Sequence, residues 1–291
     1  MTTSKSIRSY YQLNLFLIIL LFVVCTKDKE EENNSSTLQD ANEKNTNLIT
    51  ENSPPLECDT SSDYPSLGTG SPQSCDEIQN PQNKGTLDCR TDPSLGGYTN
   101  ESNGWGSYKI IGGTIRYNET KTRVERFFKT ITHGNNKKTV LTGKFKISDL
   151  SDGNTCIIQS HAGGEILQGE ETGSTNRSAQ FLLYASKANN NAIRLETHVT
   201  ENPYTTDTGG SRNVEEFKFI EYGQVYDFVY ETGYTTKGIA FSKIIVGNTE
   251  RYISHSHTTE RVYTRYGAYG TSDSNDITAQ IEFKDVNLCR N

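Results

Sequence analysis

The chain has 291 residues, of which 32% are hydrophobic and 22% are charged, and its formal net charge is -7. This length fits one large domain or one domain with appendages, and the composition is too polar for a polytopic membrane protein. Because aromatic side chains make up 10% of the chain, at least part of it is able to bury a core.

The negative charge is concentrated in one segment. Residues 26–100 carry 14 acidic and 5 basic side chains, whereas residues 101–291 are formally neutral, with 22 of each sign. A strongly charged globular surface of the kind that binds nucleic acid is therefore not expected.

Residues 1–25 have the features of an export signal. Two basic residues precede an apolar run from Leu15 to Val24, which is short for a membrane-spanning helix and fits the hydrophobic part of a signal peptide. Cys25 follows at once, and the segment resembles a bacterial lipoprotein signal, in which this cysteine is lipidated. We therefore predict an exported bacterial lipoprotein at the outer membrane or cell surface; a plain secretory signal with an incidental cysteine is the alternative.

Residues 26–86 are rich in Asn, Ser, Thr, Glu and Pro and show no sustained periodicity. Such a composition cannot bury enough apolar area to offset the entropy of ordering, so an acidic flexible linker is predicted. An exported protein meets an oxidising compartment, in which cysteines pair. We expect Cys156 to be a buried free thiol in a strand. Four cysteines are then left, with three possible pairings: Cys58, Cys75, Cys89 and Cys289.

The segment 87–291 is predicted to be the folded domain. It holds short runs of β-branched and aromatic residues, separated by turn-forming clusters. The expected strands are 144–147, 179–184, 192–199, 224–230 and 239–246. Strands of this length and spacing, without helical periodicity, predict an all-β sandwich or jelly roll. Such a fold often leaves one curved sheet face open as a concave groove, and the many tyrosines suit a groove that binds polysaccharide.

One expected strand carries a Gln-x-His pattern. Strand alternation places Gln159 and His161 on one face, and Cys156, Ile158 and Ser160 on the other.

A second expected strand lies near the C-terminus. The same alternation groups Tyr263, Arg265 and Tyr269, and Gly267 between them is expected to leave room for a ligand. In a third strand, Arg123 and Glu125 share a face. Alternation thus assigns an arginine, a glutamine, a histidine and a tyrosine each to one face of its strand. This set of side chains suits a substrate that bears a carboxylate.

These patterns, Arg-x-Glu, Gln-x-His and Tyr-x-Arg-x-Gly-x-Tyr, resemble in order and spacing those of the alginate lyases of polysaccharide lyase family 7. That family's motifs are R(T/S)E(L/V)R, Q(I/V)H and YFKAGxYNQ, on a β-jelly roll, and the similarity spans roughly residues 105–288. This chain departs from them at Phe127, Ser160, Arg265 and Gly270-Thr271. The resemblance implies a lyase that cleaves a 4-O-linked uronic-acid polymer by β-elimination. Alginate is the first choice, and ulvan and glucuronan, which related jelly-roll families cleave, come next.

The resemblance also implies roles. Arg123 and Gln159 are candidates for the clamp that stabilises charge building on the substrate carboxylate. Tyr269 is the candidate acid and also base, with His161 as the alternative base or as a group that lowers the tyrosine's pKa, which Arg265 could lower too. Substrate binding is assigned to three residues: Arg265, Tyr263 and Glu125. The scheme requires no metal and no cofactor.

Three other readings stay open. A non-catalytic surface glycan-binding lipoprotein would capture acidic polysaccharide on the same face without needing His161 or Tyr269. His255 and His257, which are expected to share a strand face, could line the groove or bind a metal. The oxygen-rich loop 273–276 could hold Ca²⁺, although it falls short of a calcium motif.

Overall fold

The computed structural model describes residues 57–58, 86–90, 96–101, 103–111, 122–128, 130–151, 153–169, 172–173, 175–176, 178–201, 211–270 and 277–290. The chain divides into two compact units, residues 1–50 and 51–291, and all described residues lie in the second. Several predictions lie outside them: the signal peptide with Cys25, most of the linker with Cys75, and the loop 273–276. No helix in the described ranges is long and apolar enough to cross a membrane.

Two antiparallel sheets form the described structure. The eight-stranded sheet has the order β15-β14-β13-β7-β17-β4-β3, and β1 pairs with β17. Its strands are β1 (Glu57–Cys58), β3 (Gly97–Asn100), β4 (Gly106–Ile111), β7 (Lys138–Leu150), β13 (Tyr226–Tyr234), β14 (Ala240–Val246), β15 (Thr249–Ser254) and β17 (Thr278–Arg290).

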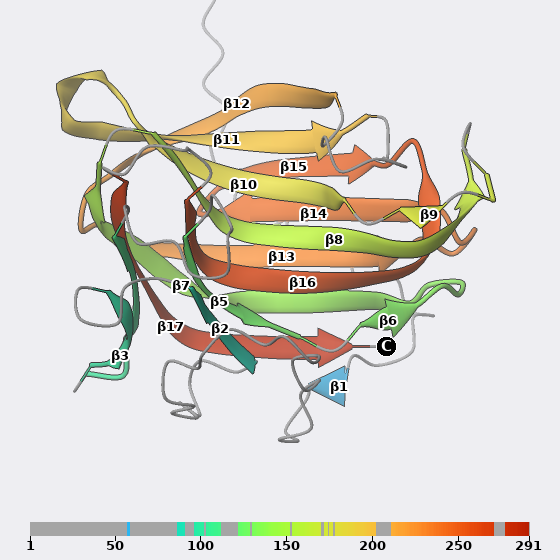
Figure 1. The fold of residues 1–291 in the computed structure, drawn as a ribbon, viewed down its shortest axis with the longest axis horizontal. Helices are drawn as coiled ribbons and strands as arrows, with labels where there is room; N and C mark the ends of the chain where they lie inside the picture. The colour runs from blue at the N-terminus through green and yellow to red at the C-terminus, as the bar shows by residue number, and fades with distance from the viewer. Residues whose placement is uncertain are drawn as a thin grey trace, which may run out of the picture. The chain divides into compact units, whose positions relative to one another are not determined.

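The nine-stranded sheet has the order β12-β11-β10-β8-β16-β5-β2, with β6 paired to β16 and β9 to β8. In Figure 1, β10, β8, β16 and β5 run side by side across it. Its strands are β2 (Thr86–Arg90), β5 (Arg123–Phe127), β6 (Ile131–Thr132), β8 (Asn154–Gln168), β9 (Thr175–Asn176), β10 (Ala179–Lys187), β11 (Ala192–Thr200), β12 (Arg212–Glu221) and β16 (Thr258–Gly270).

The all-β prediction is confirmed. Three expected strands lie within β7, β10 and β11, and the expected strands 224–230 and 239–246 overlap β13 and β14 but begin two residues and one residue too early. The turn-forming cluster 151–154 separates β7 from β8. The Asn-rich cluster after β10 forms the short 3-10 helix η1 (Asn189–Asn191), the one helical element among the described residues. The strands are longer than their apolar runs because polar residues on the outer faces continue the same alternation.

The core lies between the sheets and is built from the inward half of each alternation. Tyr108, Phe145 and Phe283 of the eight-stranded sheet are fully buried, as are Phe181 and Tyr266 of the nine-stranded sheet. This packing fixes which face of the nine-stranded sheet turns outward, because every second side chain must point away from the core.

The cysteines follow the expected pattern in part. Cys156 is a buried free thiol, as predicted. Cys289 is disulfide-bonded, and β1 places Cys58 opposite it in the register of β17.

Candidate active site

The predicted site residues gather on the outer face of β8, β16 and β5, which are neighbours in the nine-stranded sheet. In the register, His161 lies opposite Tyr263, Gln159 opposite Arg265, and Tyr269 opposite Arg123. Cross-strand partners project from the same face, so residues far apart in the sequence meet here. We call the surface formed by Arg123, Glu125, Gln159, His161, Tyr263, Arg265 and Tyr269 the site face.

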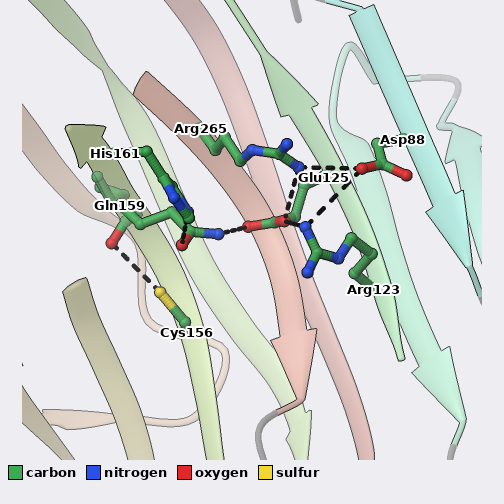
Figure 2. Close-up of polar contacts among 8 residues, drawn as sticks. Asp88, Arg123, Glu125, Cys156, Gln159, His161 and Arg265 are labelled. Atoms are coloured by element: carbon green, nitrogen blue, oxygen red, sulfur yellow. Dashed lines mark hydrogen bonds and ion pairs between the residues drawn. The ribbon is translucent and has the colours of Figure 1, made fainter. Parts of the chain in front are cut away.

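The carboxylate of Glu125 is the hub of the site face, as Figure 2 shows. The side-chain amide of Gln159 donates a hydrogen bond to its Oε1. Nη1 of Arg265 lies 3.5 Å from its Oε2, and Nη1 of Arg123 lies 3.6 Å from the same oxygen. The side chain of Glu125 is only 1% exposed, and Gln159 is equally buried, so substrate binding by Glu125 stays a prediction.

A second buried carboxylate, Asp88 of β2, completes the charge cluster. Arg265 donates to its Oδ2 at 3.0 Å, and Nη1 of Arg123 lies 3.8 Å away. The cluster therefore holds two arginines and two carboxylates and carries no net charge when all four are ionised. Burial raises the pKa of Glu125, and the charges of Arg123 and Arg265 oppose that rise.

His161 is oriented by the same network. Because the amide nitrogen of Gln159 donates to Glu125, its oxygen accepts from Nε2 of His161, at 2.9 Å. The neutral imidazole then carries its proton on Nε2, and Nδ1 is the basic nitrogen. The ring stacks on Tyr263, with centroids 5.1 Å apart and planes 10° apart. Tyr263 thus lines the site face beside the histidine.

Tyr269 lies at the other end of the site face, in a small cluster with Cys156, Leu182 and Tyr184. Burial raises its pKa, which Arg123 opposes. The cation on this ring is Arg123, whose Cζ lies 4.4 Å from the centroid, and not Arg265, which lies over Phe127 and Tyr263 instead. Because burial raises its pKa, the phenol of Tyr269 is protonated at neutral pH, which is the form of a proton donor.

The prediction that Cys156 points away from Gln159 is wrong. Ile157 and Ile158 both enter the core, and Cys156 packs beside Tyr269 on the site face. The register between β8 and β10 shifts between Leu183 and Tyr184, which leaves Ile157 as an extra residue in β8. Such a bulge reverses the alternation of every residue beyond it.

The role predicted for Gly267 also changes. Its φ is +142°, and a Cβ there would lie 2.4 Å from the carbonyl oxygen of Val124 and 2.7 Å from Cα of Glu125. Glycine is required because β5 passes so close to β16, and not to make room for a ligand.

The histidine pair is corrected as well. Residues 255–257 connect β15 to β16 and share no strand face. His255 is buried between the sheets, where Nε2 lies 2.9 Å from Oγ of Ser242, and burial lowers its pKa to about 3. In the part of the chain that the structure describes, no group of three or more His, Cys, Asp or Glu side chains could hold a metal ion.

Sequence reasoning missed three residues that border the site. Asp88 gives no signal in the sequence, because its segment meets the site only by pairing β2 with β5. Tyr184 of β10 packs against Tyr269, and Arg212 of β12 hydrogen-bonds to Tyr184. Tyr184 lies in the expected strand 179–184, where the alternation of side chains between the two faces is the signal that points to it.

A cavity of about 570 Å³ lies elsewhere, between β11, β12 and β15. Thr197, Asn213 and Arg251 line it, and Arg251 donates to the hydroxyl of Thr197. Thr197 precedes His198 in β11 and projects to the opposite face, so this cavity is separate from the site face.

The jelly-roll fold and the family that the sequence matches define the class: a polysaccharide lyase that acts on acidic uronate polymers. The sequence model of the PL28 ulvan lyases matches residues 28–290. The chain therefore belongs to the PL28 ulvan lyases. No curated protein sequence matches the chain.

Solved structures share the fold at low identity. A family 7 alginate lyase, A1-II′, in complex with product gives a TM-score of 0.50 at 13% identity, over 67% of this chain and 83% of that chain. The same lyase in complex with substrate gives 0.50 at 12% identity, over 66% and 81%. An endo-β-1,4-glucuronan lyase from Trichoderma reesei gives 0.42 at 13% identity, over 71% and 87%. The jelly-roll prediction is confirmed.

Proposed function

We propose that this lyase cleaves ulvan, at the bond on the non-reducing side of a 4-O-linked uronic acid. The observation that carries the proposal is the match to the PL28 ulvan lyases, which spans residues 28–290. It moves ulvan ahead of alginate, the first choice from the sequence motifs. The departures at Phe127 and Ser160 fit this order, because they fall within the motifs by which the chain resembles alginate lyases.

Arg123 and Gln159 form the carboxylate clamp in this proposal. Abstraction of the proton at C5 moves charge onto the adjacent carboxyl group, so donors aimed at that group stabilise the transition state. Nε of Arg123 has no hydrogen-bond partner among the described residues, and the amide of Gln159 keeps one N–H beyond its bond to Glu125. Glu125 acts through these two as a positioning residue.

Proton transfer is shared between the two ends of the site face. His161 takes the C5 proton on Nδ1, because its bond to Gln159 assigns the ring proton to Nε2. Tyr269 gives its proton to the O4 leaving group, because burial keeps the phenol protonated. The clamp lies between them: Gln159 is two residues from His161, and Arg123 lies opposite Tyr269. Tyr269 acting as both base and acid is the alternative scheme.

The experiment is a substrate panel. The protein is incubated with ulvan, glucuronan and alginate while the absorbance of the unsaturated uronate product is followed. We expect the largest initial rate with ulvan. A faster rate on another polymer would refute the substrate assignment. Binding without any rise in absorbance across the panel would instead support a non-catalytic glycan-binding protein.

We also propose that the lyase is exported and anchored through lipid on Cys25, with residues 26–86 as a tether. The support is the sequence of the first 25 residues and the acidic, breaker-rich segment after them. In a Gram-negative host, Cys25→Ala should move the protein from the membrane fraction to a soluble one. An unchanged membrane fraction would contradict the lipid anchor.

A further inference from the structure

Arg212 is a third arginine beside the site face. It opens β12 and lies opposite Thr200 of β11, two residues beyond His198. His198 points to the same side as the site, because its ring lies 4.3 Å from that of Tyr184, which packs with Tyr269. Thr200 shares the orientation of His198, and so does its cross-strand partner Arg212. The side chain reaches back over β11 to hydrogen-bond to Tyr184 of β10.

Arg212 differs from the other two arginines in its ionic contacts. Arg123 and Arg265 are each matched by the carboxylates of Asp88 and Glu125. Arg212 differs, because within the described ranges no carboxylate lies at ion-pair distance from its guanidinium. A cation on the outer face of a polymer-binding sheet attracts an anionic group of that polymer.

The neighbours of Arg212 fit an oxyanion. Nε2 of His198 is buried and has no hydrogen-bond partner among the described residues, and it lies 3.9 Å from the nearest carboxylate, that of Glu196. Burial and the charge of Arg212 lower the pKa of His198 to about 4, so the ring is neutral and leaves the positive charge to the arginine. The Arg212 guanidinium and, in the tautomer protonated on Nε2, the His198 imidazole are donors from which an oxyanion can accept.

The position suits a second sugar of the bound chain. Tyr269 carries Arg123 on its ring and packs in one cluster with Tyr184, the residue to which Arg212 hydrogen-bonds. The row from Arg123 through Tyr269 and Cys156 to Tyr184 crosses three strand spacings, roughly 14 Å in total. That span exceeds one pyranose ring, so a group bound at Arg212 belongs to a neighbouring sugar and not to the uronate held by the clamp.

We propose that Arg212, with His198 and Tyr184, binds a second anionic substituent of the polymer, a carboxylate or a sulfate ester on a sugar adjacent to the cleaved uronate. The proposal rests on the proposed function, because it takes the site face as the polymer-binding surface. It makes Arg212 a specificity-determining residue that favours polymers with a further negative charge near the scissile bond.

The test compares Arg212→Gln with Arg194→Gln. Arg194 of β11 projects from the same face, but its Nε lies 3.2 Å from the carboxylate of Glu196, so it is the matched, compensated control. KM and kcat are measured on ulvan oligosaccharides, and Kd in the Tyr269→Phe background. We expect Arg212→Gln to raise KM and Kd about tenfold or more. Its affinity should also depend less steeply on salt than that of the parent. Arg194→Gln should stay within about twofold.

Two further substrates identify the anion. If it is a sulfate ester, the difference between Arg212→Gln and the parent vanishes on desulfated ulvan; if it is a carboxylate, the difference persists there and on glucuronan. Arg212→Lys keeps the charge and should recover part of the affinity.

Unchanged KM and Kd for Arg212→Gln on every substrate would overturn the proposal. So would a fall in kcat and melting temperature at constant Kd, which would assign Arg212 a purely structural role. These results differ from failure of the proposed function, in which the unaltered protein itself leaves ulvan intact.

Discussion

At the scale of single residues, the hydrogen bonds and ion pairs of the site distinguish groups with donors left for substrate from groups that hold them. Glu125 is enclosed and accepts from Gln159, whereas Arg123 keeps 13% of its side chain exposed. Pairing buried carboxylates with arginines offsets the cost of desolvating both, and it fixes the direction in which the remaining donors point. The same logic makes Asp88 a supporting residue on the far side of Arg265.

Tyr269→Phe should lower turnover by about 100- to 10,000-fold, the range for loss of a general acid. The ring and its contact with Arg123 survive, so the affinity for ulvan oligosaccharides should change little. Steady-state rates and calorimetric Kd values check this. A variant with unimpaired kcat would remove Tyr269 from the reaction.

The raised pKa of Glu125 predicts an acid limb in the pH profile, that is, a fall in activity as the pH decreases. Its pKa lies above the ordinary 4.5, so the carboxylate protonates as pH falls toward that value and releases Gln159 and the arginines. A raised pKa means that the folded state holds this proton more tightly, so its protonation favours the fold while disabling the clamp. Over the pH range in which Glu125 becomes protonated, activity should therefore fall, and Glu125 should not contribute a parallel fall in melting temperature.

Glu125→Gln mimics the protonated form and should be about 10- to 100-fold less active at neutral pH, without the acid limb that Glu125 causes. Rates and melting temperatures from pH 4 to 8 for both proteins provide the comparison. The same acid limb in both would point to another group, with His161 the first to examine.

At the scale of secondary-structure elements, strands β8 and β16 position the chemistry through local irregularities. The extra residue Ile157 turns Cys156 to the side of Tyr269, and Gly267 lets β5 lie close to β16. Neither feature changes which strands pair, yet each decides what a side chain faces. Bulges are common next to active sites for this reason.

Gly267→Ala should destabilise the fold by about 2 kcal/mol or more, because the new Cβ meets backbone atoms of β5 at a strained φ. Gly163→Ala in β8 is the control. There the nearest atoms belong to the flexible side chain of Arg261, so a smaller loss is expected. Urea unfolding compares the two; equal losses would contradict the close-approach explanation.

At the scale of the whole sandwich, a buried polar network joins the two sheets behind the site. The hydroxyl of Tyr230 donates to Ser160 at 2.8 Å and lies 3.2 Å from Ser242, which in turn contacts His255. Ser160 lies between Gln159 and His161 in β8, so this hydrogen bond ties the eight-stranded sheet to the core side of the strand that carries both site residues. Burial raises the pKa of Tyr230 to about 12, which keeps it a donor.

Tyr230→Phe should cost about 1–3 kcal/mol of unfolding free energy, because Ser160 and Ser242 lose a buried partner. Tyr252→Phe is the matched control, since Tyr252 is 54% exposed and the change should stay within about 0.5 kcal/mol. Chemical denaturation measures both. A loss no larger than that of the control would show that the network does not join the sheets energetically.

Much of the fold could be predicted from the sequence because alternation is a local property. The strands around Phe145 and Leu195 bury alternate side chains, and their apolar spacing shows it directly. Alternation also placed Arg123 with Glu125, and Gln159 with His161, on shared faces. The prediction failed at Cys156. Every second side chain points to the same face only in an uninterrupted strand, and the sequence gives no sign of the bulge at Ile157.

The sequence by itself determined the residue types of the chemistry and the faces that carry them: a clamp, a histidine and a tyrosine for a uronate polymer. Only the tertiary structure decided that Glu125 binds both members of the clamp, that Asp88 joins them and that Arg212 lies beside the site face without a carboxylate partner among the described residues. The physical reason is that strand pairing brings together segments distant in the chain, and burial, which sets charge and exposure, exists only once they meet.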